Sequence, residues 1–90
     1  MVRNLLFPQP NPHYNFERAC MEFSGQDANR TILCRISDEA LRDHFDNNEQ
    51  ESTQIFHTHH LKIEDEARRK YLAGNLEHDG SISLTTWDIK

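Results

Sequence analysis

Three histidines stand within four residues of the segment IFHTHHLKIEDEARRKYL, residues 55–72, whose pattern is typical of an α-helix. At about 100° per residue, His57, His60 and Glu64 project on one side of that helix, and His59 projects on the opposite flank. Spacings of three and four residues are those that metal-binding helices use. The first question is therefore whether this cluster holds a metal ion.

A closed zinc site needs four ligands, and a catalytic one needs three firm ligands beside an open position. The sequence indicates no further ligand for His57, His60 and Glu64, so they stay an outside candidate, and we predict neither a metal nor another cofactor. We expect His60 to fill a partly buried slot instead and to hydrogen-bond Glu64.

Nucleophilic catalysis by a cysteine is the next chemistry to consider. Cys34 lies in an apolar alternation that points it inward, where a thiol is inert, and Cys20 points outward with no cation or helix N-terminus fixed beside it. The two should lie on opposite faces of a hairpin and remain unbridged. Ser37, Asp38 and His44 are better explained as a helix cap, a helix-dipole partner and a surface residue. We expect no enzyme.

Positive charge is densest at four residues of the same helix: Lys62, Arg68, Arg69 and Lys70. A phosphate-binding strip is one interpretation, but residues 68–70 point in three directions, and acidic residues 64–66 stand one turn earlier, where they favour intrahelical ion pairs. The chain also has a formal charge of −5, which speaks against wholesale binding to nucleic acid or anionic membranes. A solvated helix face is favoured.

The elements that position these residues follow from the pattern of apolar residues. Phe56, Ile63, Ala67 and Tyr71 form one buried stripe of the long helix. Before it we expect a hairpin with strands at residues 16–23 and 31–36, followed by a short helix at residues 37–45 that Ser37 caps. After it we expect a last strand at residues 81–84. Either Asn48 with Glu51, or Ser52, caps the long helix.

Ninety residues fit one domain, with a proline-rich extended arm at 1–15 and a globular core at 16–89. The fold predicted is α+β: a small antiparallel sheet of three strands, with room for a fourth from the arm, against two helices in the order β-β-α-α-β. Two cysteines, no signal peptide and no apolar stretch near twenty residues indicate a cytoplasmic protein without a membrane span.

Leu61 and Leu72 lie on the side of the long helix away from Ile63 and would be exposed if that helix simply covered a sheet. Either the apolar residues of the arm, 5–7, cover them, or they form a partner surface together with the four basic residues. The arm is favoured, because a small core cannot leave three apolar residues unused.

The stretches YNFERACMEFSGQD, ILCRISDEALRDHF, ARRKYLAG and SLTTWDI, in this order and spacing, resemble domain of unknown function family 1488, a group of small bacterial proteins. The resemblance covers roughly residues 5–89 and implies a strand pair, two helices and a final strand. Family members often carry an Asn-Arg pair where this chain has His59 and His60, so the resemblance implies that a histidine site is no family property. It implies no activity, cofactor or catalytic residue.

These observations favour a non-catalytic module that binds a protein partner or serves as a small regulatory accessory. The alternative is a nucleic-acid-associated regulator that uses the basic strip. A contiguous positive face joining the strip to Arg18, Arg35 or Arg42 would favour the alternative.

Overall fold

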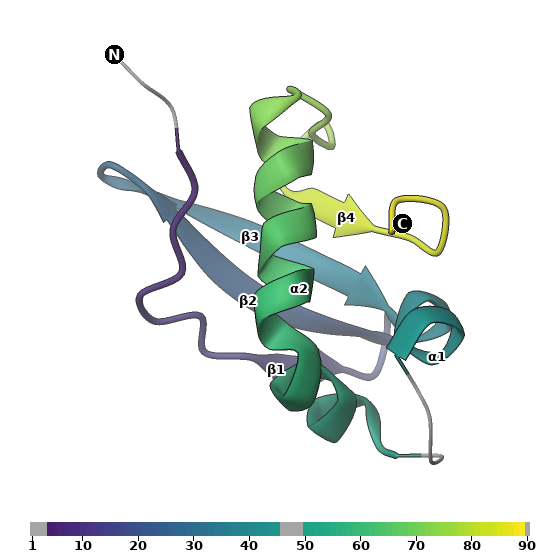
Figure 1. The fold of residues 1–90 in the computed structure, drawn as a ribbon. Coiled ribbons are helices and arrows are strands. Elements are labelled where there is room, and N and C mark those ends of the chain that lie inside the picture. The colour runs from purple at the N-terminus through teal and green to yellow at the C-terminus, as the bar shows by residue number, and fades with distance from the viewer. Residues whose placement is uncertain (1–3, 46–49, 90) are drawn as a thin grey trace.

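The computed structural model describes residues 4–45 and 50–89, which form an α+β fold with a sheet on one side and helices on the other (Figure 1). The α+β class is therefore confirmed. The elements, in chain order, are β1 (His13–Asn15), β2 (Cys20–Asp27), β3 (Arg30–Ser37), α1 (Asp38–Phe45), α2 (Ser52–Leu72) and β4 (Ile82–Leu84).

The four strands form one sheet in the order β1-β2-β3-β4. β1, β2 and β3 pair antiparallel, but β4 pairs parallel to β3, with Cys34 opposite Ile82. The expectation of a wholly antiparallel sheet is thus wrong for its last pair. The reason is the connection: α1 and α2 both lie between β3 and β4. Such a crossover returns the chain to the end of the sheet where β3 begins, so that β4 runs in the same direction as β3.

The hairpin is confirmed, although its turn is tighter than expected. β2 continues through Gly25 to Asp27, and the turn consists of Ala28 and Asn29, with Ala28 at a φ of 54°. Residues 16–19 are not part of the strand. Cys20 and Cys34 are free and face opposite sides of the sheet, as predicted, but Cys20 is buried at 4% exposure rather than open to solvent.

The arm supplies the fourth strand, since β1 pairs with β2, and its earlier part also adds to the core. Leu5 is fully buried, while the backbone N–H and C=O of Leu6 both bond to Gln26 on the far end of β2. Leu5 sits against Gly25, which has no side chain to fill the space. The arm is extended, as expected, but it does not lie only on the surface.

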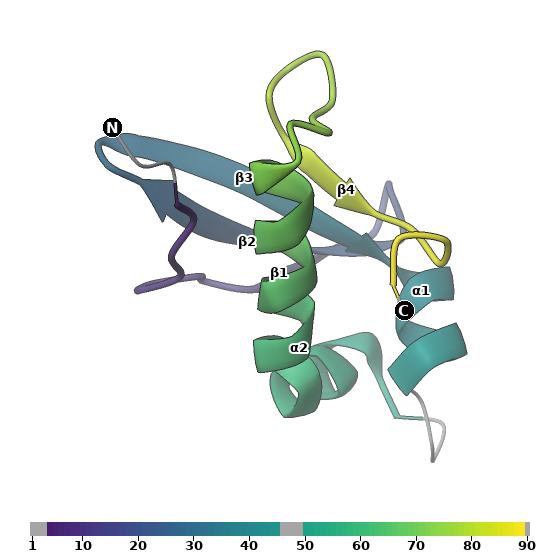
Figure 2. The same ribbon diagram turned by 45° about the horizontal axis from the view of Figure 1, so that its top comes forward.

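α2 lies across one face of the sheet, and the two ribbon views agree on this layer arrangement (Figures 1 and 2). The predicted stripe is confirmed, because Phe56, Ile63, Ala67 and Tyr71 are all buried at 1% exposure or less. The backbone leaves helical geometry once, at His59, with φ −113° and ψ 18°. No helix among residues 4–45 and 50–89 is long and apolar enough to span a membrane.

The helix ends follow the predicted local chemistry at the start of α1 and the end of α2, but not at the start of α2. The Ser37 Oγ accepts a hydrogen bond of 3.1 Å from the Ala40 N–H, which confirms it as the cap of α1. Of the two alternatives for the α2 cap, Ser52 is wrong, because it is the first helical residue and follows the N-cap residue Glu51, which makes no side-chain cap bond. Asn48, the other alternative, lies outside the described residues. Gly74, at φ +78°, follows the helix end as predicted.

Candidate functional site

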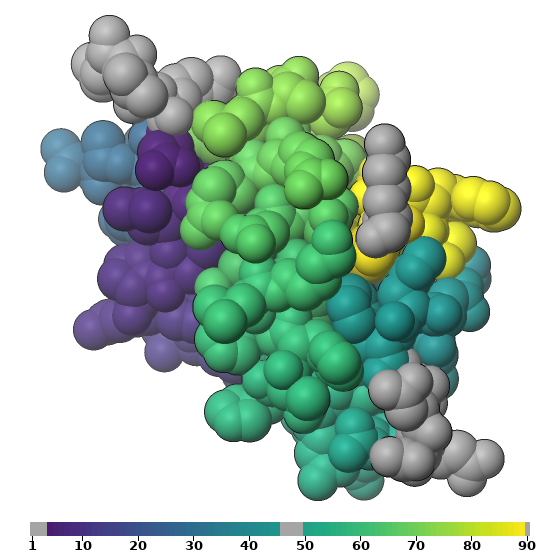
Figure 3. All heavy atoms as spheres, in the orientation of Figure 1, coloured from purple at the N-terminus to yellow at the C-terminus, as the bar shows by residue number. Residues whose placement is uncertain are grey.

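The outer surface of α2 carries two exposed leucines. Leu61 is 69% exposed and Leu72 is 50% exposed. They are separated by about three helical turns and therefore lie on one line along the helix. In the space-filling view α2 lies in front at the centre, and no other described segment covers the front of it (Figure 3). The expectation that the arm covers both leucines is wrong, because Leu5 is drawn into the core.

Arg68, on the same line, holds the arm in place. Its Nε donates a 2.7 Å hydrogen bond to the Leu5 carbonyl oxygen, and its guanidinium lies 5.6 Å from the centre of the Phe7 ring. Its Nη1 also pairs with Asp65 at 2.5 Å. Arg68 is thus a fixed cation that links α2 to the arm.

The other basic residues of the predicted strip are engaged within the chain as well. Lys70 Nζ donates to the Ser83 carbonyl at 2.6 Å and to Asp88 at 3.0 Å, which joins α2 to β4 and the last turn. Lys62 and Arg69 both pair with Glu66, at 3.0 and 3.5 Å. The predicted intrahelical ion pairs are therefore confirmed for Arg68 and Arg69, whereas Lys70 pairs outside the helix.

The histidines are placed as expected. His60 is half-buried, and its Nδ1 lies 3.2 Å from Glu64 Oε2, while the His57 ring stacks beside the His60 ring with centroids 6.3 Å apart. His59 is on the opposite flank and packs against Phe45, 5.0 Å away. Within the described part of the chain, no three His, Cys, Asp or Glu side chains are grouped so that they could hold a metal ion.

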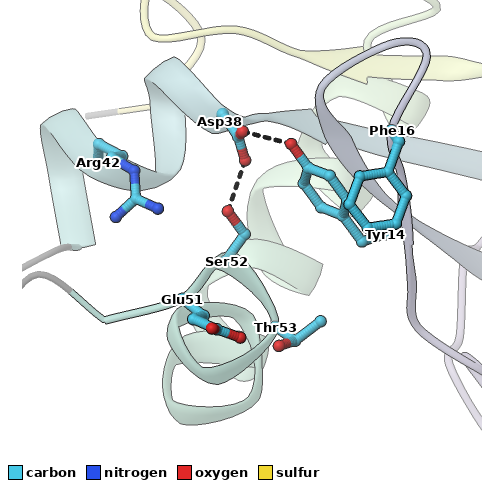
Figure 4. Close-up of a pocket in the computed structure, with 7 residues that line it drawn as sticks. All are labelled: Tyr14, Phe16, Asp38, Arg42, Glu51, Ser52 and Thr53. Atoms are coloured by element: carbon cyan, nitrogen blue, oxygen red, sulfur yellow. Dashed lines mark hydrogen bonds between the residues drawn. The ribbon is translucent and has the colours of Figure 1, made fainter.

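A pocket of about 380 Å³ opens where α1, the start of α2 and β1 meet (Figure 4). The residues that line it are Tyr14, Phe16, Asp38, Arg42, Glu51, Ser52 and Thr53. Tyr14 and Phe16 form its aromatic wall, in an edge-to-face pair with centroids 4.8 Å apart, and Phe16 is 87% exposed.

Asp38 is the centre of this pocket. Its Oδ2 accepts a hydrogen bond from the Tyr14 hydroxyl and its Oδ1 accepts one from Ser52, each at 2.5 Å (Figure 4). The hydrogen bond to Asp38, together with burial and the charge of that carboxylate, raises the pKa of Tyr14 above its usual value. Asp38 therefore joins β1 to the starts of both helices. Sequence reasoning found Asp38 only as a helix-dipole partner, because no local pattern links these three residues.

Asp38→Asn is expected to lower the pKa of Tyr14 toward its ordinary value of 10.0, because the variant removes the charge that opposes the tyrosinate. The measurement is an NMR titration of tyrosine carbons labelled at Cζ. Tyr71, bonded to Asp27 elsewhere, is the internal control. An unchanged Tyr14 titration would show that the Tyr14–Asp38 contact does not form in solution.

Glu22, on the sheet face opposite α2, is held by three neighbours. Its carboxylate accepts hydrogen bonds from Arg35 at 2.8 Å and Asn15 at 3.2 Å, and it lies 2.9 Å from His13. The hydrogen bond from Arg35 is the main reason why the pKa of Glu22 is lowered. This network connects β1, β2 and β3 and leaves Arg35 paired.

Glu22→Gln is expected to destabilise the chain by about 1 to 3 kcal/mol at neutral pH, the usual cost of removing a charged hydrogen-bond partner. Because the pKa of Glu22 is lower in the folded chain, its contribution is fully present above the ordinary value of 4.5 and is lost as pH falls through the folded pKa. Urea unfolding between pH 7 and pH 3 should show the two proteins converging in acid. Exposed Glu17→Gln is the control, and a constant difference at all pH values would contradict the assignment.

Residues 5–84 match the sequence profile of a family described as Protein of unknown function (DUF1488). The chain belongs to the DUF1488 family. A solved DUF1488 structure, the crystal structure of a protein of unknown function from Shewanella loihica PV-4 at 1.60 Å resolution, shares its fold with a TM-score of 0.77. The two are 18% identical, and the match covers 93% of this chain and 94% of that one. No curated protein matches the chain.

Proposed function

We propose that this DUF1488 protein is a non-catalytic protein-binding or regulatory accessory module, and that its partner binds the outer surface of α2. The residues of this surface, here called the leucine face, are Leu61, Asp65, Arg68 and Leu72. The observation that carries the proposal is the exposure of two large aliphatic side chains on one line of a helix. A chain of this size needs most of its large apolar residues in the core. Two leucines that are exposed on one line of a helix therefore favour a partner surface.

A protein partner has more support than a nucleic acid. Arg68 and Lys70 already bond to backbone carbonyls within the chain, and Asp65 places a negative charge in the middle of the leucine face. Arg35 lies on the opposite face of the sheet, paired with Glu22, so it does not extend the basic strip. Arg35 therefore does not contribute to the contiguous positive face that the nucleic-acid alternative requires.

The state of the reactive groups supports a non-catalytic role. Burial raises the pKa of the Cys34 thiol to about 12, and burial also raises the pKa of Cys20. A nucleophilic cysteine needs a lowered pKa and access to substrate. We place the protein in the bacterial cytoplasm, which two free thiols and the Shewanella relative support.

Site-specific photo-cross-linking in the native bacterium tests this function. A photoreactive residue at position 61 or 72 is expected to give a discrete protein adduct, whereas one at His78, exposed beyond the end of α2, is not. Adding Leu72→Glu should abolish the adduct from position 61. Adducts of equal yield from all three positions, or from none, would refute a partner on this face, and adducts lost after nuclease treatment would favour the nucleic-acid alternative.

A further inference from the structure

The leucine face has an internal symmetry along α2. Leu61 and Leu72 are equally far from the midpoint between Glu66 and Ala67, and so are Asp65 and Arg68. At 100° per residue all four side chains leave the helix within a sector of about 60°. The face therefore has a leucine at each end and, between the leucines, two residues of opposite charge at equal distances from the midpoint.

We infer that the leucine face binds the same face of a second copy of this chain, with the two α2 helices antiparallel. This inference rests on the proposed function, since it names the partner of the same surface. In an antiparallel pair, residues equally far from the midpoint lie opposite each other. Leu61 then meets Leu72 of the second copy, and Asp65 meets Arg68, at both ends of one two-fold contact.

Charge decides between the two directions in which the helices could pair. A parallel pair would place Asp65 against Asp65 and Arg68 against Arg68, and like charges that face each other across an interface are repelled. The antiparallel pair places each Asp65 against an Arg68. A second copy thus offers both the apolar and the charged complement of this surface.

The surroundings of Arg68 and Asp65 also favour this contact. The Leu5 carbonyl and the Phe7 ring hold the Arg68 side chain, so little freedom remains for it to lose on binding. The Asp65 side chain is 62% exposed and has oxygen lone pairs left beside its bond to Arg68. Two leucines from each copy make a small interface, and we expect a reversible dimer of the weak class.

Cysteine cross-linking tests the register. Leu61→Cys chains mixed with Leu72→Cys chains are expected to form a disulfide between position 61 of one copy and position 72 of the other. Either variant alone is expected to form about tenfold less, because in the antiparallel pair two copies of position 61 are about 16 Å apart along the helix. Native Cys20 and Cys34, buried at 4% and 0% exposure, should not compete. The readout is a non-reducing gel with mass spectrometry of the linked peptides.

Sedimentation of the unmodified chain tests the dimer without a cysteine. From about 10 µM to about 1 mM the mean mass should rise from monomer toward dimer, and Asp65→Arg should weaken the association by about tenfold or more. Glu39→Arg makes the same change in net charge at an exposed position of α1 and should leave the association unchanged.

Three outcomes would overturn the inference. The first is an unmodified chain that stays monomeric up to about 1 mM. The second is efficient linking of Leu61→Cys chains with each other, which would require parallel helices, and the third is equal linking in all samples. The proposed function is judged separately by the mass of the photo-adduct. Twice the chain mass supports a second copy, a different mass from the leucine face retains the proposed function while refuting the second copy, and no face-specific adduct refutes both.

Discussion

Phe56→Ala is expected to lower the free energy of unfolding by about 3 to 5 kcal/mol, the range for removing a buried aromatic side chain. Phe56 is 1% exposed, and its ring lies 4.9 Å from that of Phe23, so it joins the first half of α2 to the centre of the sheet. A domain of this size has about 5 to 15 kcal/mol in total. The melting temperature should therefore fall by more than about 12 °C, which thermal denaturation followed by circular dichroism would measure.

Leu61→Ala is the matched control, because it removes a large apolar side chain from the same helix at a position that is 69% exposed. Its expected effect on the monomer is within about 0.5 kcal/mol. The two should be compared at low protein concentration, where self-association does not contribute to stability. Equal small losses in both variants would mean that α2 does not present Phe56 to the sheet.

What the sequence predicted well is local. The α2 stripe depends only on the helical period, the Ser37 cap depends on a contact three residues away, and the turn at Gly74 depends on the backbone freedom of glycine. The side-by-side placement of His60 and Glu64 follows from the same period. Each of these features is decided within one turn of chain.

What the sequence did not predict depends on where distant segments meet. The direction of β4 depends on how α1 and α2 return the chain to the sheet, and the pocket at Asp38 depends on contacts with Tyr14 and Ser52, 24 and 14 residues away. The α2 N-terminus shows a related limit: the Ser52 hydroxyl, one of the two alternatives for the cap of that helix, bonds to Asp38 of α1 instead. A tertiary contact thus replaced the local one.

The arm shows the same limit most clearly, because proline content predicted its extended backbone but not the direction of its side chains. Adjacent residues of an extended segment point to opposite sides, so one of Leu5 and Leu6 had to turn toward the sheet and the other away. Leu5 is the buried one, at 0% exposure, and Leu6 remains 54% exposed. The choice follows from Gly25, whose missing side chain leaves the space that Leu5 fills.

Leu5→Ala is therefore expected to destabilise the chain by about 2 to 5 kcal/mol, as for other buried leucines, whereas Leu6→Ala should cost within about 0.5 kcal/mol. Gly25→Ala should also destabilise, because its Cβ would lie 2.7 Å from Leu5 Cδ1. Urea unfolding of the three variants measures the difference. If the arm were only a surface segment, Leu5→Ala and Leu6→Ala would be equally mild and Gly25→Ala would be tolerated. A large loss for Leu5→Ala and Gly25→Ala alone would instead place the arm in the core, and with it the backbone carbonyl that positions Arg68 on the leucine face.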